Sequence, residues 1–259
     1  MGDVMSNAKA EMEAMLEAFR DEVPSHYSVC SLQAPKNDCV TFLRSEKYID
    51  SLHAMVGQGV KNVTVIAPSN VVLPAVSGVS YYLTDHVDLL FTLFNNHVRK
   101  GEDPRSYDRI SSSAILDVGA VIGAEGVSIA KYKDERVLFR HYGRVVLEDN
   151  VYIGANAVIQ RGRIDETVIG KGSMVSSLCV VGANTIIGQN CTITIQAGIS
   201  GSARIGDRCW LGIGAKVRDY VSICDDVFVG MGSVVTKDIT EPGVYAGNPC
   251  RFLRPHGDK

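Results

Sequence analysis

The sequence predicts a mainly β protein, in which a parallel β-helix of six-residue repeats follows a small α/β domain. From Ile169 to Val235 every sixth residue is aliphatic, which makes twelve consecutive matches. Four residues after nearly all of them stands a compact side chain, such as Ser173 or Cys179. A helix would place apolar residues every three or four positions and a hairpin strand every two, so neither explains this period. The period fits a solenoid of short parallel strands, each pointing one aliphatic side chain inward.

Three faces of six residues make a coil of eighteen, so this run alone predicts four coils. Compact residues keep the turns tight, and glycine in or beside that position tolerates unusual backbone angles. The repeat is expected to begin near Ile115. It is interrupted at 128–145 and slips near 163–166, where we expect the loss of one residue. After Val235 the prolines and glycine of the tail are expected to forbid another coil.

Upstream of the repeat, helical and strand patterns alternate. One apolar face indicates an amphipathic helix within the first twenty residues: Met12, Met15, Leu16 and Phe19. Short apolar runs predict strands at 39–43, 63–67 and 81–83, and apolar stripes predict helices at 45–56 and 87–98. Ser45 is the expected N-cap of the first of these two helices. Together these segments form a compact α/β unit.

These patterns divide the chain into four expected parts. The parts are an N-terminal helix and connector (1–36), a small α/β domain (37–105), the β-helix (106–238) with an inserted loop (128–145), and a C-terminal tail (239–259). A solenoid absorbs such an insertion as a loop at one corner, and loops of this kind often build a binding face.

Composition excludes several classes of function. A formal net charge of -3 over 259 residues gives no reason to expect nucleic acid or a membrane surface as partner. No apolar run approaches the roughly 20 residues of a membrane span, and the first residues lack the apolar block of a signal peptide. Seven cysteines without a C-x-x-C pair argue against a disulfide framework and against a zinc site. Three of them occupy the compact repeat position and are expected to be buried in a reducing cytoplasm.

The six-residue pattern resembles the hexapeptide repeat of left-handed β-helix acyltransferases. That resemblance implies left-handed coils and a homotrimer with acyl-donor grooves between subunits. The end of the chain, from GMGSVV to NPCRFLRP, is similar to the closing signature of members that use acetyl-CoA. The resemblance therefore implies a set of cofactor-binding residues: Gly214, Ala215, Gly232, Ser233, Lys237, Arg251 and Arg254. The three cations suit phosphate, although basic residues on a solvated tail are the alternative.

A second resemblance, from Val40 onward, is to the UDP-acylglucosamine N-acyltransferases of lipid A synthesis. The segment TFLRSEKY resembles that family's uridine-binding segment, in which two aromatic residues six positions apart sandwich the base. The resemblance implies that Phe42 and Tyr48, with Ser45 between them, bind the substrate. An aromatic pair on a strand and the following helix is also a common core arrangement.

The chain departs from this family at the catalytic positions. The family's catalytic histidine falls at Ala183 and a second family histidine at Tyr220, and the helical extension associated with acyl carrier protein is not recognised after the tail. These departures favour a short acyl group carried on coenzyme A. A neutral amine attacks a thioester without prior deprotonation, and a base then needs only to collect a proton. The candidate bases or orienting groups are His141, Asp165 and Glu166, and Asn184 is a candidate donor to the developing oxyanion.

The leading hypothesis is a cytoplasmic N-acetyltransferase that uses acetyl-CoA and a UDP-linked amino sugar. Its product would serve a bacterial surface glycan, such as the O-antigen of lipopolysaccharide. Three alternatives stay open: the lipid A activity with a hydroxyacyl carrier protein, O-acetylation of a sugar hydroxyl, and an inactive binding scaffold. No metal is expected.

Overall fold

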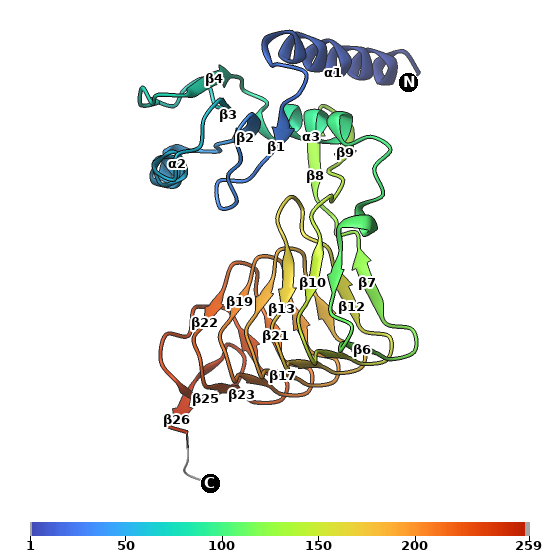
Figure 1. The fold of residues 1–259 in the computed structure, drawn as a ribbon, viewed down its shortest axis with the longest axis vertical. Helices are drawn as coiled ribbons and strands as arrows, with labels where there is room; N and C mark the ends of the chain where they lie inside the picture. Colours follow the sequence, from blue (N-terminus) through green and yellow to red (C-terminus); the bar gives the residue numbers. More distant parts are fainter. Residues whose placement is uncertain (1, 257–259) are drawn as a thin grey trace. The chain divides into compact units, whose positions relative to one another are not determined.

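The computed structural model describes residues 2–256, which form two compact units (Figure 1). The α/β unit extends to Glu102 and also contains Val127–Arg140. The β-helix unit contains Asp103–Gly126 and continues from His141. Each unit is described separately.

The α/β unit is built on a parallel sheet of order β1-β2-β3-β4. Its strands are β1 (Ser28–Val29), β2 (Cys39–Phe42), β3 (Val63–Ala67) and β4 (Val79–Leu83). Its helices are α1 (Gly2–Glu22), α2 (Ile49–Gly57) and α3 (Val87–Val98), and η1 (Glu46–Tyr48) is a short 3-10 helix ahead of α2. The predicted helices and strands are present with small shifts at their ends. Ser45 precedes η1 but makes no side-chain capping bond, so the expected N-cap role is wrong.

The insertion in the repeat is a hairpin of the α/β unit and not a loop of the β-helix. Strand β8 (Ile129–Tyr132) pairs antiparallel with β9 (Glu135–Leu138). The hairpin is held by α3, because Asn96 Nδ2 donates to the Leu138 carbonyl at 2.7 Å. It also contacts α1, where the Tyr132 hydroxyl donates to Glu11 at 2.8 Å. The sequence spacing predicted that the repeat is interrupted here. It did not predict that the hairpin packs on α1 and α3, which lie far away along the chain.

One disulfide is present in the α/β unit, which corrects the expectation drawn from cysteine spacing. It joins Cys30 to Cys39, with 5.9 Å between their Cα atoms. Parallel pairing of β1 with β2 brings the two residues together, since the Cys30 N–H donates to the Val40 carbonyl. The expectation for Cys179, Cys191 and Cys209 is confirmed, because all three are buried as free thiols.

The β-helix has three faces, each a stack of parallel strands (Figure 1). The first face contains β5 (Arg109–Ile110), β10 (Val145–Leu147), β13 (Thr167–Ile169), β16 (Ile186–Ile187), β19 (Arg204–Ile205) and β22 (Ser222–Ile223). The second contains β6 (Ile115–Leu116), β11 (Tyr152–Ile153), β14 (Met174–Val175), β17 (Thr192–Ile193), β20 (Trp210–Leu211), β23 (Val227–Val229), β25 (Gly243–Ala246) and β26 (Arg251–Arg254). The third contains β7 (Val121–Ala124), β12 (Val158–Gln160), β15 (Val180–Val181), β18 (Gly198–Ile199), β21 (Lys216–Val217) and β24 (Val234–Val235). A short 3-10 helix, η2 (Pro104–Tyr107), precedes β5.

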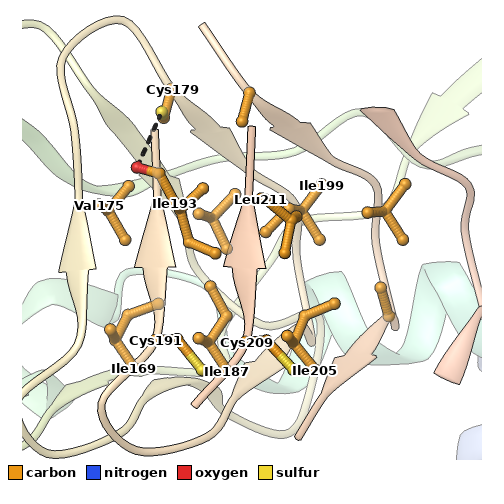
Figure 2. Packing of buried hydrophobic residues seen from close by; sticks show 14 of the residues in the cluster. Ile169, Val175, Cys179, Ile187, Cys191, Ile193, Ile199, Ile205, Cys209 and Leu211 are labelled. Atoms are coloured by element: carbon orange, nitrogen blue, oxygen red, sulfur yellow. Dashed lines mark hydrogen bonds between the residues drawn. The ribbon is translucent and has the colours of Figure 1, made fainter. Parts of the chain in front are cut away.

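The aliphatic residues of the repeat fill the interior of the coils. Figure 2 shows residues eighteen positions apart aligned in rows, for example Ile169, Ile187 and Ile205. All three are at most 3% exposed. The run from β13 to β24 contains twelve strands, which confirms the four predicted coils.

The compact inward residues have a second role, because several of them satisfy buried carbonyls. Each donates its hydroxyl or thiol hydrogen to the carbonyl fifteen residues later: Ser173 to Gly188 (2.7 Å), Cys179 to Thr194 (3.0 Å), Thr185 to Ser200 (3.1 Å), Cys191 to Gly206 (3.0 Å) and Cys209 to Cys224 (3.1 Å). A buried carbonyl without a partner costs free energy, so a small donor is favoured here over a plain methyl group.

The corners impose a regular backbone strain. Every sixth residue from 172 to 232 has a left-handed backbone conformation: Gly172, Leu178, Asn184, Asn190, Gln196, Ser202, Arg208, Gly214, Tyr220, Asp226 and Gly232. Leucine and tyrosine are unusual there, because a Cβ atom disfavours this region by roughly 1–2 kcal/mol. The closely hydrogen-bonded coils above and below therefore hold these corners in place.

The first coils are irregular; the interruption by the insertion was expected, whereas the change in coil length and the starting point differ from the expected layout. The first coil pairs Leu116 with Ile153, 37 residues on, because the hairpin interrupts it. The next pairs Leu147 with Ile169, 22 residues on, so this coil gains four residues over eighteen and the expected loss of one is wrong. Strand β5 also begins the helix before Ile115.

The expected end of the β-helix at Val235 is likewise wrong. Strand β25 pairs in parallel with β23 and adds one more rung to the second face. Only then does the chain turn back, as β26 pairs antiparallel with β25. The prolines prevent another complete coil, but they flank β25 and do not interrupt it.

Two neighbouring glycines separate backbone strain from crowding. Gly214 has φ +68° and no atom within 4 Å of an added Cβ, whereas a Cβ on Gly212 would lie 2.6 Å from the Met231 backbone nitrogen. We expect Gly214→Ala to lower the free energy of unfolding by about 1–2 kcal/mol, and Gly212→Ala to lower it further, because backbone must move. Urea unfolding at one protein concentration measures both. Equal losses would contradict this explanation.

Candidate functional site

The enlarged coil gathers polar side chains that the regular coils lack. Its extra residues form the corner 161–166, between β12 and β13. The segment that enters β10 lies against this corner, since the Tyr142 N–H donates to the Arg163 carbonyl and the Gly143 N–H to the Gly162 carbonyl, both at 3.0 Å. The two residues that follow His141 thus lie against the corner that contains Asp165.

Arg161 anchors this corner from inside the protein. Its side chain is 2% exposed, and Nη2 lies 3.2 Å from the carboxylate of Asp108, which is also buried. Arg161 Nε donates to the Gly123 carbonyl at 2.9 Å, and Nη1 donates to the Gly143 carbonyl at 3.1 Å. Asp108 accepts a further bond from the Val145 N–H at 2.8 Å. A buried cation needs such a full set of partners, so Arg161 ties the coils on either side of the insertion together.

His141 is buried and neutral, not solvated. Its residue is 3% exposed. Burial lowers the pKa of its imidazole to about 4, although hydrogen bonding to the Arg161 backbone opposes this shift. Its backbone N–H donates to Glu125 Oε1 at 3.0 Å. The ring is packed under Gly126, because a Cβ there would lie 2.7 Å from His141 Cε1.

Gln160 bonds to the backbone at Ala183 and lies near the same glycine as His141. Its Oε1 atom lies 3.2 Å from the same added Cβ position on Gly126, beside the imidazole. The same oxygen accepts a hydrogen bond from the Ala183 N–H at 3.3 Å. The position at which the resemblance placed a histidine is therefore hydrogen-bonded to a side chain that, like His141, lies near Gly126.

The other candidate catalytic residues hold the corner. Glu166 accepts hydrogen bonds from Arg144, and Arg109 lies 3.9 Å away, so its carboxylate is engaged in ion pairs. Asn184 Oδ1 accepts from the Arg163 N–H at 2.9 Å, which leaves its Nδ2 as the group able to donate. Asp165 contributes its backbone carbonyl, which packs so tightly against Gly143 and Gly162 that neither position can hold a Cβ.

The candidate cofactor residues fall into two groups. Ala215 and Ser233 are 0% exposed and point into the core, so any contact with a cofactor would come from their backbone. Gly214 and Gly232 lie one coil apart at the same corner, where the Gly232 N–H donates to the Ile213 carbonyl. The cations follow at the end of the helix: Lys237 beyond β24, and Arg251 and Arg254 on β26. Lys237 and Arg251 are exposed, and Arg254 is half-buried.

The candidate uridine pair lies in the α/β unit. Phe42 ends β2 and packs on Phe91, with 4.4 Å between ring centroids. The Arg44 guanidinium lies 5.4 Å from the Phe42 centroid. Tyr48 is half-buried, and the Lys47 ammonium lies 4.9 Å from its ring centroid. A base that stacks on Phe42 or Tyr48 would displace the side chain of Arg44 or Lys47 from the ring. Both of these cations are exposed, so they can move into solvent.

Among residues 2–256, no cluster of three or more His, Cys, Asp or Glu side chains has an arrangement that could hold a metal ion. Within the same range, none of the helices combines the length and the apolar character that crossing a bilayer requires.

Comparison with known proteins identifies the repeat. Residues 202–237 match the family model "Bacterial transferase hexapeptide (six repeats)", and residues 144–177 match "Hexapeptide repeat of succinyl-transferase". The repeat region belongs to the hexapeptide-repeat transferase family.

Two curated relatives carry the name UDP-3-O-acylglucosamine N-acyltransferase. The one from Idiomarina loihiensis is 44% identical over 137 residues, covering 53% of this chain and 40% of that protein. The one from Coxiella burnetii is 44% identical over 80 residues, covering 30% and 23%. The matches thus span less than half the length of these relatives. Among solved structures, a hexapeptide transferase family protein from Anaplasma phagocytophilum matches with a TM-score of 0.48 at 23% identity, covering 58% of the chain described here and 80% of the Anaplasma chain.

Sequence reasoning missed Arg161, Asp108 and Gln160. Their spacing carries no motif, because each is brought into the site by coil stacking across the insertion. One signal was available in the sequence. Arg161 directly follows the strand Val158–Gln160, at the point where the repeat breaks, and a charge that is buried there requires a partner of opposite charge.

The buried ion pair predicts an unequal response of two arginines. Arg161→Met should lower the free energy of unfolding by about 3–5 kcal/mol, because it leaves Asp108 buried without its cation. Arg208→Met is the matched control: Arg208 pairs with Asp225 and Asp226, but its side chain is 50% exposed, so little change is expected. Chemical unfolding measures both variants, and a similar loss in both would contradict the anchoring role of Arg161.

The low pKa of His141 predicts a pH dependence of stability. The unfolded imidazole titrates near 6.5 and the folded one near 4, so the unfolded chain binds more protons between these values. Stability should therefore fall as pH decreases from 6.5 to 4. His141→Asn should reduce that decline, measured as the difference in unfolding free energy between pH 7 and pH 5. An NMR titration giving an ordinary pKa for His141 would refute the prediction.

Proposed function

We propose that this protein is an N-acetyltransferase that transfers an acetyl group from acetyl-CoA to the amine of a UDP-linked amino sugar. The observation that carries the proposal is the cluster at the enlarged coil, where Gln160 bonds to the Ala183 backbone and lies, like the neutral His141, near Gly126. Ala183 is where the resemblance to N-acyltransferases places a histidine. The names of the curated relatives support an amine of a UDP sugar as acceptor.

The proposed chemistry needs positioning more than a strong base. The neutral amine nitrogen attacks the thioester carbonyl carbon, a C–N bond forms, and the carbonyl π electrons move to oxygen. Asn184 Nδ2 or backbone N–H groups stabilise that oxyanion. Collapse breaks the C–S bond, and the thiolate of CoA leaves. In this proposal the excess proton of the ammonium passes to the imidazole of His141, which burial keeps neutral, although the same low pKa makes it a weak base.

The ligands are assigned to separate elements. Lys237, Arg251 and Arg254 would hold the CoA phosphates at the end of the β-helix, because cations near exposed strands meet phosphate without desolvation. Phe42 and Tyr48 would stack on uracil. A homotrimer is supported by a corner stripe of exposed apolar residues: Leu178 (49%), Ile195 (37%), Ile213 (49%) and Met231 (76%). Such a stripe marks a surface that a partner covers.

The second candidate is the lipid A type reaction, which the names of the curated relatives favour. It has the same acceptor class but takes a hydroxyacyl group from a carrier protein. The two candidates are separated by the donor alone, so the same acceptor can be offered with acetyl-CoA or with hydroxyacyl carrier protein.

The deciding experiment measures thiol release from acetyl-CoA with a panel of UDP-, TDP- and GDP-linked amino sugars. We expect turnover with a UDP-amino sugar, and His141→Ala should lower it by about 10²–10⁴ without weakening acetyl-CoA binding. Phe42→Ala should instead raise KM for the sugar nucleotide.

Each outcome bears on one assignment. No thiol release with any amino sugar, combined with turnover of hydroxyacyl carrier protein, would replace the proposal by the second candidate. A loss below about tenfold in His141→Ala would remove His141 as proton acceptor while leaving the reaction in place. Ala183→His tests whether the site keeps the geometry of the relatives, since a large gain in turnover is expected only if the amine lies beside residue 183.

A further inference from the structure

The α/β unit contains a cavity that the proposed function does not use. Its volume is about 570 Å³, which lies within the range of small-molecule sites. It is lined by the end of α1, the connector that leads into β1, and the end of α3. Arg20, Lys36 and His97 contribute polar groups, and Tyr27 and Phe94 contribute aromatic ones.

This cavity is separate from the candidate uridine pair. Ser28 and Val29 of β1 line it, and these residues pair with Cys39 and Val40 at the start of β2. Phe42 lies three residues after Cys39, at the other end of β2, which is roughly 10 Å farther along the strand. Since the sheet is parallel, the cavity lies toward the amino ends of the strands and the aromatic pair toward the carboxyl ends.

The charges around the cavity leave it positive. Among the described residues that line the cavity, Glu102 is the acidic one, and its carboxylate forms an ion pair with Arg99 at 2.8 Å. Within residues 2–256, no ion pair involves Arg20 or Lys36. Helices α1 and α3 both end here, and each brings a partial negative charge of about one half. The two full positive charges of Arg20 and Lys36 exceed these partial charges, which together amount to about one negative charge, so the cavity retains attraction for anions.

His97 lies among the same positive charges. Burial lowers the pKa of its imidazole, and the charges of Arg20 and Lys100 lower it further. The groups around His97 are thus Arg20 from α1, Lys100 and Arg99 beyond α3, and Glu102 paired with Arg99. A cation-rich hollow of this kind disfavours a third positive charge and favours a bound anion.

We propose that this cavity binds a small molecule carrying a phosphate or pyrophosphate group. The anion lies between Arg20 and Lys36, which approach from different segments, and the rest of the molecule contacts the aromatic rings of Tyr27 and Phe94. Phosphate suits the site because its several oxygens accept from two cations at once. The site is distinct from the acceptor and acetyl-donor sites of the proposed reaction.

Isothermal titration calorimetry with inorganic pyrophosphate, a sugar phosphate and a nucleoside diphosphate tests the proposal on the full chain. We expect saturable binding of at least one probe. Arg20→Gln and Lys36→Gln should each weaken it by about tenfold or more, which corresponds to one lost charge-assisted contact. Lys9→Gln is the matched control: it removes a charge from the same helix eleven residues earlier, about 16 Å away, and should leave binding unchanged.

A spectroscopic readout keeps the test independent of folding and turnover. The imidazole NMR signals of His97 should shift as the probe is added to the wild-type chain, and Arg20→Lys should retain binding better than Arg20→Gln. Unaltered melting temperatures show that the variants fold. The proposal is overturned if no probe binds, or if Arg20→Gln and Lys9→Gln bind equally well. Because the readout is binding of phosphate compounds, failure here leaves acetyl transfer untouched, and failure of acetyl transfer leaves this site untouched.

Discussion

The satisfaction of buried backbone groups inside a narrow coil is the constraint on which the β-helix depends. A two-residue strand offers few hydrogen bonds, so each strand must be paired on both sides by the coils before and after it. The corner carbonyls lie inside, away from water, and five of them accept from a serine, threonine or cysteine fifteen residues earlier. Each coil therefore has room inside for aliphatic side chains and for small hydrogen-bond donors. The left-handed corners are held by this packing and by these hydrogen bonds.

A departure from that regularity has to supply its own partners. In the coil with four additional residues, some backbone carbonyls and N–H groups lack the hydrogen-bond partners that neighbouring regular coils would provide. Arg161, Asp108 and Asn184 supply them, and Glu166 pairs with Arg144 at the same corner. This is also where a buried neutral histidine is kept. Groups that could move a proton or hold an oxyanion thus collect at the irregular coil because the regular coils have no place for them.

The α/β unit follows different physics, since its parallel sheet is covered by helices and by a hairpin that arrives from the middle of the repeat. The hairpin contributes Ala130 to a cluster with Met12 and Leu89, so this unit requires a segment from beyond its own sequence range. The cavity and the aromatic pair of Phe42 and Tyr48 lie toward opposite ends of the strands. Parallel strands create that separation, because all their amino ends meet at one edge and all their carboxyl ends at the other.

The sequence by itself determined the β-helix, because a six-residue period over twelve repeats is compatible with one kind of core. It also determined the helices and most of the strands of the α/β unit, because their apolar patterns follow the helical and strand periods. Tertiary structure decided the rest. The extra residues of the irregular coil, the buried Arg161–Asp108 pair, the hairpin on α3 and the Cys30–Cys39 bond join residues whose separation carries no period. Their contacts depend on which coil or strand lies beside which, and that is settled only when distant segments pack together.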